Sequence, residues 1–182
     1  MSQVIAVYGG SFDPPHLAHT LVAAYVLAAH AVDLLLVVPT AEHPFDKRLA
    51  PFEHRMRMCE LAMRDLHRVE VSPVEEALQR PSLTLRTLEH LQHHYPDAQL
   101  RLVIGSDLLP ELAAWHRVER VQELAPLLVV PRAGYSAAAH DLPALPAISS
   151  TEIRSRLRTG DSTTGLLSPI VAQYAQAHAL YR

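Results

Sequence analysis

Short apolar runs alternate along the chain with longer segments in which apolar residues recur every three or four positions. Runs of this length are typical of buried strands, and the recurrence is typical of amphipathic helices. The chain begins with an apolar run at 4–7, a helical segment from His16 to about His30, and a second run at 33–38 closed by Pro39. Strand, helix and strand in this order predict a βαβ unit with parallel strands and a right-handed crossover.

The same alternation continues through the rest of the chain. We expect further strands at 68–72, 100–104 and 127–132, and further helices at 53–66, from 81, from 149 and from 168. The segment 134–146 predicts a loop, with a short strand near Ile148. The expected buried stripes of the helices are Leu17, Leu21, Tyr25 and Ala28; Met56, Cys59, Met63 and Leu66; Leu85, Leu88 and Leu91; Ile153 and Leu157; and, against the sheet edge, Ile170, Tyr174, Ala177 and Tyr181. This pattern predicts one domain over 1–182, a Rossmann-like α/β fold with a doubly wound parallel sheet of about five strands and helices on both faces.

Composition narrows the class of protein. A chain of 182 residues that is 49% hydrophobic and 19% charged can bury a core without disulfides, and its single cysteine, Cys59, excludes an internal one. With 16 Lys+Arg against 19 Asp+Glu, the net charge of −3 favours neither nucleic acid nor an anionic membrane as partner. No signal peptide or membrane span is evident, so we expect a cytoplasmic protein; the oligomeric state stays open.

Histidines are frequent, twelve in all, and three of them cluster at His90, His93 and His94. No spacing among them matches a zinc signature with a Cys pair or a His-Glu-x-x-His helix. We therefore interpret the cluster as solvated residues on a helix surface.

The segment Gly9-Gly10-Ser11-Phe12-Asp13-Pro14-Pro15-His16-Leu17-Ala18-His19 connects the first strand to the first helix. We expect its two glycines to turn the backbone tightly and to let a ligand approach closely. His16 and His19, three residues apart at a helix start, share one face beside free backbone N–H groups that favour an anion. The segment predicts a phosphate site with two added donors.

This segment resembles the nucleotidyltransferase signature that ends in His-x-Gly-His, with Ala18 where that family usually has glycine. Together with the motifs below, it is most similar to bacterial nicotinate-nucleotide adenylyltransferases. The resemblance implies that Gly9, Gly10, Ser11, Phe12 and His19 bind ATP, and that His16 and His19 act on the reacting phosphate.

A second motif, Ile148-Ser149-Ser150-Thr151-Glu152-Ile153-Arg154, resembles the family's Ile-Ser-Ser-Thr-x-Ile-Arg. Ser149 and Glu152 have the spacing of a capping box. The helix start and an arginine one turn in suit the β- and γ-phosphates of a nucleotide, which points to Ser150, Thr151 and Arg154 as ATP-binding residues.

Gly105-Ser106-Asp107 follows the strand at 100–104, at an edge of the sheet where ligands gather. Gly105 permits close approach, and the resemblance implies that Asp107 binds the ATP ribose. As a bare motif the three residues would also serve as a helix cap.

Three residues are implied in binding the acceptor. Lys47 belongs to a loose version of a Pro-Pro-His-Lys-like element, Thr84 to a Ser-Tyr-Thr-x-x-Thr-Leu-like element in which Leu83 replaces tyrosine, and Trp115 follows Asp107 at the family's spacing. The alternatives are a mobile basic loop for Lys47, a cap formed by Ser82 or Thr84, and a core position for Trp115.

The resemblance implies adenylyl transfer from ATP to nicotinate mononucleotide, giving deamido-NAD and pyrophosphate, with Mg²⁺ carried by ATP and no metal ligand in the protein. The acceptor phosphate is already ionised, so we expect neither a protein nucleophile nor a general base, but positioning and charge neutralisation by His16, His19, Lys47 and Arg154. Two alternatives stay open: a transferase for nicotinamide mononucleotide, phosphopantetheine or another phosphate ester, and a module that senses a nucleotide without turnover.

Overall fold

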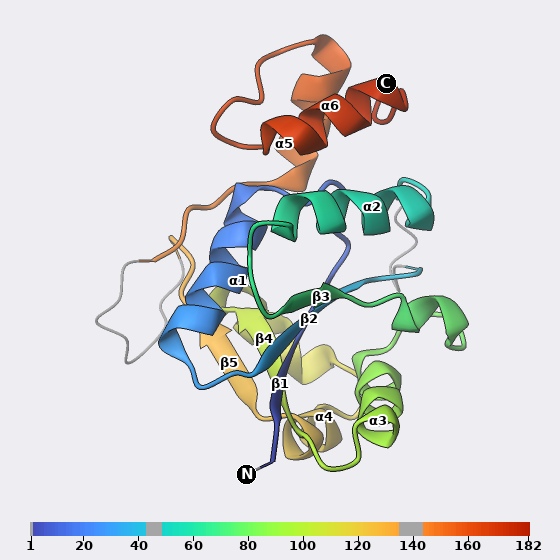
Figure 1. Ribbon diagram of the computed structural model, residues 1–182, viewed down its shortest axis with the longest axis vertical. Coiled ribbons are helices and arrows are strands. Elements are labelled where there is room, and N and C mark those ends of the chain that lie inside the picture. The colour runs from blue at the N-terminus through green and yellow to red at the C-terminus, as the bar shows by residue number, and fades with distance from the viewer. Residues whose placement is uncertain (1, 43–48, 135–143) are drawn as a thin grey trace.

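The computed structural model describes residues 2–42, 49–134 and 144–182, and a parallel sheet lies at its centre (Figure 1). The strands are β1 (Val4–Gly10), β2 (Leu34–Pro39), β3 (Val69–Val71), β4 (Gln99–Gly105) and β5 (Leu127–Val130). Their order is β3-β2-β1-β4-β5, and every neighbouring pair is parallel. The doubly wound Rossmann-like fold expected from the sequence is confirmed.

Helices connect the strands and cover both faces of the sheet. They are α1 (Leu17–Ala29), α2 (Phe52–Met63), α3 (Thr84–His94), α4 (Val118–Leu124), α5 (Ser150–Thr159) and α6 (Pro169–Ala177), with 3₁₀ helices η1 (Val74–Ala77) and η2 (Ser106–Ala114). None in the parts of the chain described is long and apolar enough to cross a membrane.

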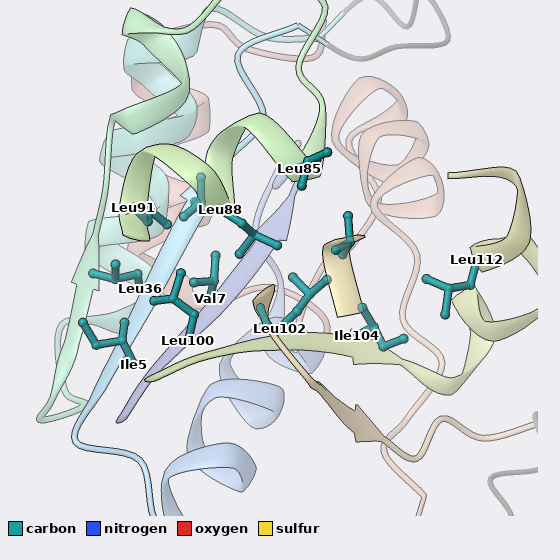
Figure 2. Packing of buried hydrophobic residues seen from close by; sticks show 13 residues of the cluster. Ile5, Val7, Leu36, Leu85, Leu88, Leu91, Leu100, Leu102, Ile104 and Leu112 are labelled. Atoms are coloured by element: carbon teal, nitrogen blue, oxygen red, sulfur yellow. The ribbon is translucent and has the colours of Figure 1, made fainter. Parts of the chain in front are cut away.

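Successive residues of β1 point to opposite faces of the sheet and so belong to two separate cores. Ile5 and Val7 pack with the leucines of α3 on one face, as Figure 2 shows, and Ala6 and Tyr8 pack with α1 and α2 on the other. The predicted stripe of α3, Leu85, Leu88 and Leu91, is buried as expected. Burial of both sheet faces explains why β1 and β2 read as continuous apolar runs.

The buried face of α1 differs from the prediction. Its buried residues are Ala18, Val22, Ala23 and Val26, whereas Leu21 of the predicted stripe is 42% exposed. The helix is apolar on nearly all sides, so spacing alone offers two overlapping stripes. The face with two alanines is the one that is buried, and small side chains there let a helix lie close to its neighbours.

The chain beyond β5 also differs from the prediction. The helix α6 buries Val171 and Ala175 in a cluster with Met58 of α2 and Ile153 of α5, rather than packing on the sheet edge. In Figure 1, α5 and α6 lie together beyond α2, on the side away from the sheet. The strand expected near Ile148 is instead a single bridge between Arg132 and Leu145.

Candidate active site

The strand order reverses between β1 and β4, which are neighbours in the centre of the sheet. Ligands of doubly wound folds bind outside the carboxyl ends of the strands at such a point. The segment 11–16 leaves β1 there, and Ser106 and Asp107 leave β4 there. The two halves of the predicted nucleotide site therefore meet at the carboxyl ends of the two central strands.

The predicted glycine turn is not a turn at the glycines. Gly9 and Gly10 are the last residues of β1, and the left-handed residue is Phe12, with φ +47°. A Cβ at Gly10 would lie 3.2 Å from the buried Phe12 ring, so Gly10 leaves room for that ring. A Cβ at Gly9 would meet nothing within 4 Å, which leaves open space beside the strand end. Of the two glycines, only Gly9 therefore leaves room for the expected close approach, and the Phe12 side chain is buried in the core.

His16 and His19 lie together beyond the end of β1. Their rings stack with centroids 3.7 Å apart and an interplanar angle of 17°, and the Phe12 ring packs edge-on against His19 at 4.8 Å. The backbone N–H of His16 donates to Nδ1 of His19 at 3.1 Å. A neutral His19 therefore carries its proton on Nε2, where it serves as a donor. Nδ1 of the buried His16 has no hydrogen-bond partner in the described parts of the chain.

Both imidazoles are neutral at neutral pH. Burial, reinforced by the nearby Arg132 guanidinium, lowers the pKa of His16 to about 4. Burial, His16 and Arg132 likewise hold the pKa of His19 well below its usual value of 6.5. The pair therefore presents neutral hydrogen-bond donors to an incoming anion, and a phosphate beside it would favour the protonated form.

Arg132 is a member of this site that the sequence interpretation left out of its site residues. Its Nε lies 3.7 Å from Oδ1 of Asp107, and its backbone N–H donates to Oγ of Ser106 at 3.0 Å. The available signal was its position just after a buried strand, since the carboxyl ends of all parallel strands share one edge.

Gly105 and Asp107 form one unit at the end of β4. A Cβ at Gly105 would collide with the Asp107 carboxylate, which folds back over the strand end. Gly105 is the residue before η2, and no side chain caps that helix, so the capping alternative does not explain the motif. The Asp107 side chain keeps about a third of its surface exposed and is free to accept hydrogen bonds from a ligand.

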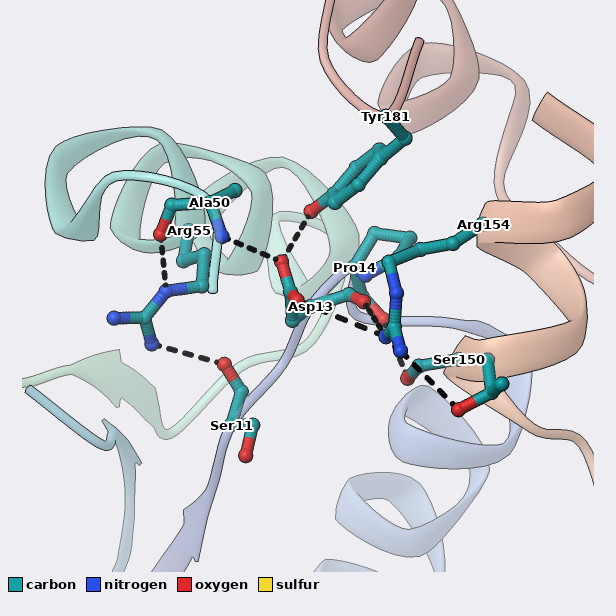
Figure 3. Close-up of polar contacts among 9 residues, drawn as sticks. Ser11, Asp13, Pro14, Ala50, Arg55, Ser150, Arg154 and Tyr181 are labelled. Carbon is teal, nitrogen blue, oxygen red and sulfur yellow. Dashed lines mark hydrogen bonds and ion pairs between the residues drawn. The ribbon is translucent and has the colours of Figure 1, made fainter. Parts of the chain in front are cut away.

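The second motif docks directly on the first (Figure 3). Oγ of Ser150 donates to the carbonyl of Pro14 at 3.1 Å, across 136 residues of sequence. Nη1 of Arg154 donates to the carbonyl of Asp13 at 2.7 Å, and its Nη2 donates to the hydroxyl of Thr151 at 3.2 Å. The structure thus brings Ser150, Thr151 and Arg154 to the loop that precedes His16.

The capping box predicted for α5 is wrong. Ser149 is the N-cap residue but its side chain makes no capping hydrogen bond. Glu152 instead pairs with Arg156 at 2.7 Å, one helical turn further on. A charged partner at i+4 lies within reach and offers a stronger acceptor–donor pair than the backbone does.

Arg55 is a second residue that the sequence interpretation missed. It is 1% exposed and donates to the carbonyls of Ala50 at 2.9 Å, Ser11 at 3.0 Å and Thr40 at 2.7 Å. These bonds tie the loop after β1 to both ends of the loop between β2 and α2. An arginine four positions before Cys59, on the buried side of a helix, was the signal for it.

The residues expected to bind the acceptor are less connected. Thr84 is the first residue of α3, and neither it nor Ser82 caps the helix; Ser82 instead accepts the backbone N–H of Glu42 at 3.2 Å. Trp115 is half-buried at the end of η2, against the apolar cluster shared with α3. Lys47 lies outside the described residues. The acceptor-binding roles of all three stay predictions.

Two other interpretations concern Cys59 and the histidine cluster. Cys59 is fully buried in the core, as expected, and burial raises the pKa of its thiol. His90, His93 and His94 are exposed on α3. In the described parts of the chain, no three His, Cys, Asp or Glu side chains lie where they could hold a metal ion.

Two helix starts and an imidazole pair lie together at the switch point of a doubly wound sheet, an arrangement typical of sites for nucleotide phosphates. Residues 7–156 match the model of the cytidylyltransferase-like family. The class defined by the fold and the site is therefore that of the nucleotidyltransferases.

Similar proteins narrow this class. A protein of Anaeromyxobacter dehalogenans named a probable nicotinate-nucleotide adenylyltransferase is 47% identical over 98% of this chain and 96% of its own. One of the same name from Thermus thermophilus is 36% identical over 98% and 99%. The nicotinic acid mononucleotide adenylyltransferase of Plasmodium falciparum, solved with NaAD, shares the fold, with a TM-score of 0.85 at 20% identity over 98% and 97%. The chain belongs to the cytidylyltransferase-like family and, within it, to the nicotinate-nucleotide adenylyltransferases.

Proposed function

We propose that this chain transfers the adenylyl group of ATP to the 5′-phosphate of nicotinate mononucleotide, forming deamido-NAD and pyrophosphate. The observation that carries the proposal is the contact between the two motifs: Ser150 and Arg154 hydrogen-bond the loop that leads to His16 and His19. This arrangement surrounds one strand end with donors from two helix starts, as a triphosphate requires.

The chemistry needs little beyond positioning. The acceptor phosphate is ionised and attacks the α-phosphorus in line, while pyrophosphate leaves, so no protein group has to remove a proton. In this proposal Nε2 of His19 donates to an oxygen of the reacting phosphate, and the His16 ring stacked on it supplies the second donor. Arg154, with Ser150 and Thr151 beside it, neutralises the leaving pyrophosphate, because negative charge moves onto it as the bond breaks.

In this proposal the rest of the nucleotide binds at the carboxyl ends of β1 and β4. The open space at Gly9 and the backbone of Ser11 and Phe12 receive the phosphates, and Asp107 accepts the ribose hydroxyls above Gly105. Arg132 holds the Asp107 carboxylate and contributes positive charge near both histidines.

Mg²⁺ fits this site as an ion carried by ATP. The side chains placed near the phosphates are donors rather than oxygen ligands, and the two nearby carboxylates, Asp13 and Asp107, are paired with Arg154 and Arg132. The ion would therefore take its ligands from phosphate oxygens and water, and it would offset charge on the triphosphate.

The acceptor binds, in this proposal, on the α3 side of the sheet. Thr84 and its helix start bind the nicotinate carboxylate, the Trp115 ring stacks on the pyridine, and Lys47 binds the acceptor phosphate. A transferase for nicotinamide mononucleotide, phosphopantetheine or another phosphate ester is the second candidate, favoured by Leu83 where the family pattern has tyrosine.

The whole chain, 1–182, acts in this proposal as a single cytoplasmic domain. The two C-terminal helices support this, because Arg154 and the cluster around Met58 attach α5 and α6 to the rest of the molecule. The lone buried Cys59 agrees with a reducing compartment.

The test is to incubate the protein with ATP, Mg²⁺ and each of the candidate acceptors, measuring pyrophosphate and the dinucleotide product. We expect nicotinate mononucleotide to exceed nicotinamide mononucleotide by about 30- to 1000-fold in kcat/KM, since a missing carboxylate leaves buried donors unpaired at roughly 2–4 kcal/mol. Equal efficiency for the two would refute the assigned acceptor. Binding of ATP with no pyrophosphate from any acceptor would indicate the sensing module.

A further inference from the structure

Tyr181, which lies beyond the end of α6, reaches the loop after β1. Its hydroxyl donates to Oδ1 of Asp13 at 2.8 Å, a contact across 168 residues of sequence (Figure 3). The sequence pattern assigned Tyr181 to the buried face of the last helix, but α6 ends at Ala177. The side chain therefore has a different task from the apolar packing that was expected of it.

The backbone after α6 adopts unusual conformations to deliver this side chain. Ala179 and Tyr181 have φ of +52° and +66°, in the left-handed region that non-glycine residues rarely occupy. The backbone N–H of Leu180, between them, donates to the carbonyl of Ala175 at 2.9 Å. Strain of this kind persists where surrounding contacts hold it, and the bond to Asp13 is such a contact.

The Asp13 carboxylate contacts three separate segments of the chain, at Ala50, Arg154 and Tyr181. Its carboxylate is 2% exposed; Oδ1 also accepts the backbone N–H of Ala50 at 3.1 Å, and Oδ2 lies 3.6 Å from Nη1 of Arg154. That same nitrogen donates to the Asp13 carbonyl. The orientation of one buried carboxylate thus affects both Arg154 and the start of α2.

The Tyr181 hydroxyl is suited to a permanent donor role. Burial and the adjacent Asp13 carboxylate raise its pKa far above neutrality, so it keeps its proton. A buried carboxylate that loses one of its donors turns toward the partners that remain. Without the hydroxyl, Asp13 would be free to rotate toward Arg154 and away from Ala50.

We propose that Tyr181 is a positioning residue for adenylyl transfer: its hydroxyl orients the Asp13 carboxylate, which fixes the Arg154 guanidinium against the leaving phosphates. The proposal rests on the proposed function. Arg154 acts most strongly when charge moves onto the pyrophosphate, so its misplacement lowers kcat more than it weakens binding of ATP.

Tyr181→Phe removes only the hydroxyl, and Tyr174→Phe is the matched control. The Tyr174 hydroxyl also lies in the C-terminal region and bonds Nδ1 of His54 at 2.9 Å, with no contact to Asp13. We expect kcat to fall about tenfold in Tyr181→Phe with the KM for ATP changed less than about twofold, and both constants to stay near wild type in the control. A Tyr181→Phe protein with wild-type kcat would overturn the proposal.

A double variant separates positioning from general loss of stability. In an Arg154→Lys background the guanidinium fork is already absent, so Tyr181→Phe should cost less than about twofold in kcat. Multiplication of the two single losses would show that Tyr181 acts independently of Arg154, and the proposal would fail.

A measurement without turnover distinguishes this failure from failure of the proposed function. If the wild-type protein forms no dinucleotide, the proposed function is wrong, and amide hydrogen exchange still tests the contact. We expect exchange at Ala50 and Leu180 to be about tenfold faster in Tyr181→Phe and unchanged in Tyr174→Phe. Equal exchange in both variants would refute the positioning role.

Discussion

The half of the site assigned to the phosphates differs in construction from the half assigned to the acceptor. Around the phosphates, Ser150 and Arg154 hydrogen-bond the loop that leads to His16, and His16 itself is buried. On the acceptor side, Thr84 begins a helix without a side-chain cap, and Trp115 is half-buried against an apolar cluster.

This difference matches the demands of the two tasks. Stabilising a phosphoryl transition state requires donors that are already oriented, since reorientation during the reaction would cost free energy. Selecting an acceptor requires only different affinities for different molecules, which loops and helix ends can supply. The departures from the family pattern in the described residues follow this division, because Leu83 immediately precedes α3 on the acceptor side, and Ala18 is fully buried in α1.

Substitution of the two histidines is the strongest test of this difference between the phosphate side and the acceptor side. His16→Ala and His19→Ala should each lower kcat by about 10²–10³, with smaller changes in the KM for ATP, because each removes one preorganised donor to the reacting phosphate. Steady-state kinetics on proteins shown to be folded by circular dichroism measures this. Near-normal kcat in both variants would show that His16 and His19 only pack, and it would contradict the view that the phosphate side holds donors that are already oriented.

Sequence patterns predicted the fold well where period and burial agree. The central strands were found because both faces of the sheet are buried there and the strands are apolar, as at 34–38. The face of α1 was missed because a helix that is apolar on most sides offers no contrast. The position of α6 was missed because it packs on other helices, and an apolar stripe does not say what covers it.

Sequence patterns also predicted the location of the site better than its internal contacts. The end of β1, the end of β4 and the start of α5 were each identified from local motifs, and parallel topology brought them together. Arg55 and the Tyr181 contact were not, because buried polar pairs between distant segments leave no local period. Arg132 lies between these cases, since its place at a strand end is visible but its pairing with Asp107 is not.

Trp115 tests the acceptor half. If the ring stacks on the pyridine, Trp115→Ala should raise the acceptor KM by about 5- to 150-fold, corresponding to roughly 1–3 kcal/mol for stacking, and leave the KM for ATP nearly unchanged. The kinetic constants for both substrates, together with the melting temperature, decide the matter. A much lower melting temperature with an unchanged acceptor KM would mean that the ring only covers the apolar cluster of α3.

The pH dependence of stability tests the burial of the phosphate half. The pKa of His16 is about 4 in the folded protein and about 6.5 unfolded, so the unfolded chain binds the extra proton as the pH falls below 6.5. Its contribution to stability is therefore complete at pH 7 and declines toward pH 4, by about 2 kcal/mol between pH 7 and pH 5.

Urea unfolding at pH 7 and pH 5 measures this contribution. His16→Gln should remove it and reduce the pH dependence to the part that His19 contributes, whereas His90→Gln, at an exposed position on α3, should leave the wild-type dependence in place. Identical pH dependence in wild type and His16→Gln would contradict the assigned burial of the imidazole.

The smallest expected effect lies directly behind the phosphate half, at Ala18. This residue stands where the family signature has glycine, and its side chain is fully buried on the face of α1 that points into the core. Because the methyl group is fully buried, Ala18→Gly should leave kcat within about twofold, while the free energy of unfolding falls by about 1 kcal/mol, as expected for glycine inside a helix. Ala23→Gly, at a second buried alanine of α1 five residues further from the site, should cost about the same stability. Urea unfolding and steady-state kinetics on both variants measure these two effects. A change in kcat confined to Ala18→Gly would contradict the expectation. It would show that packing of α1 at position 18 affects the placement of His16 and His19.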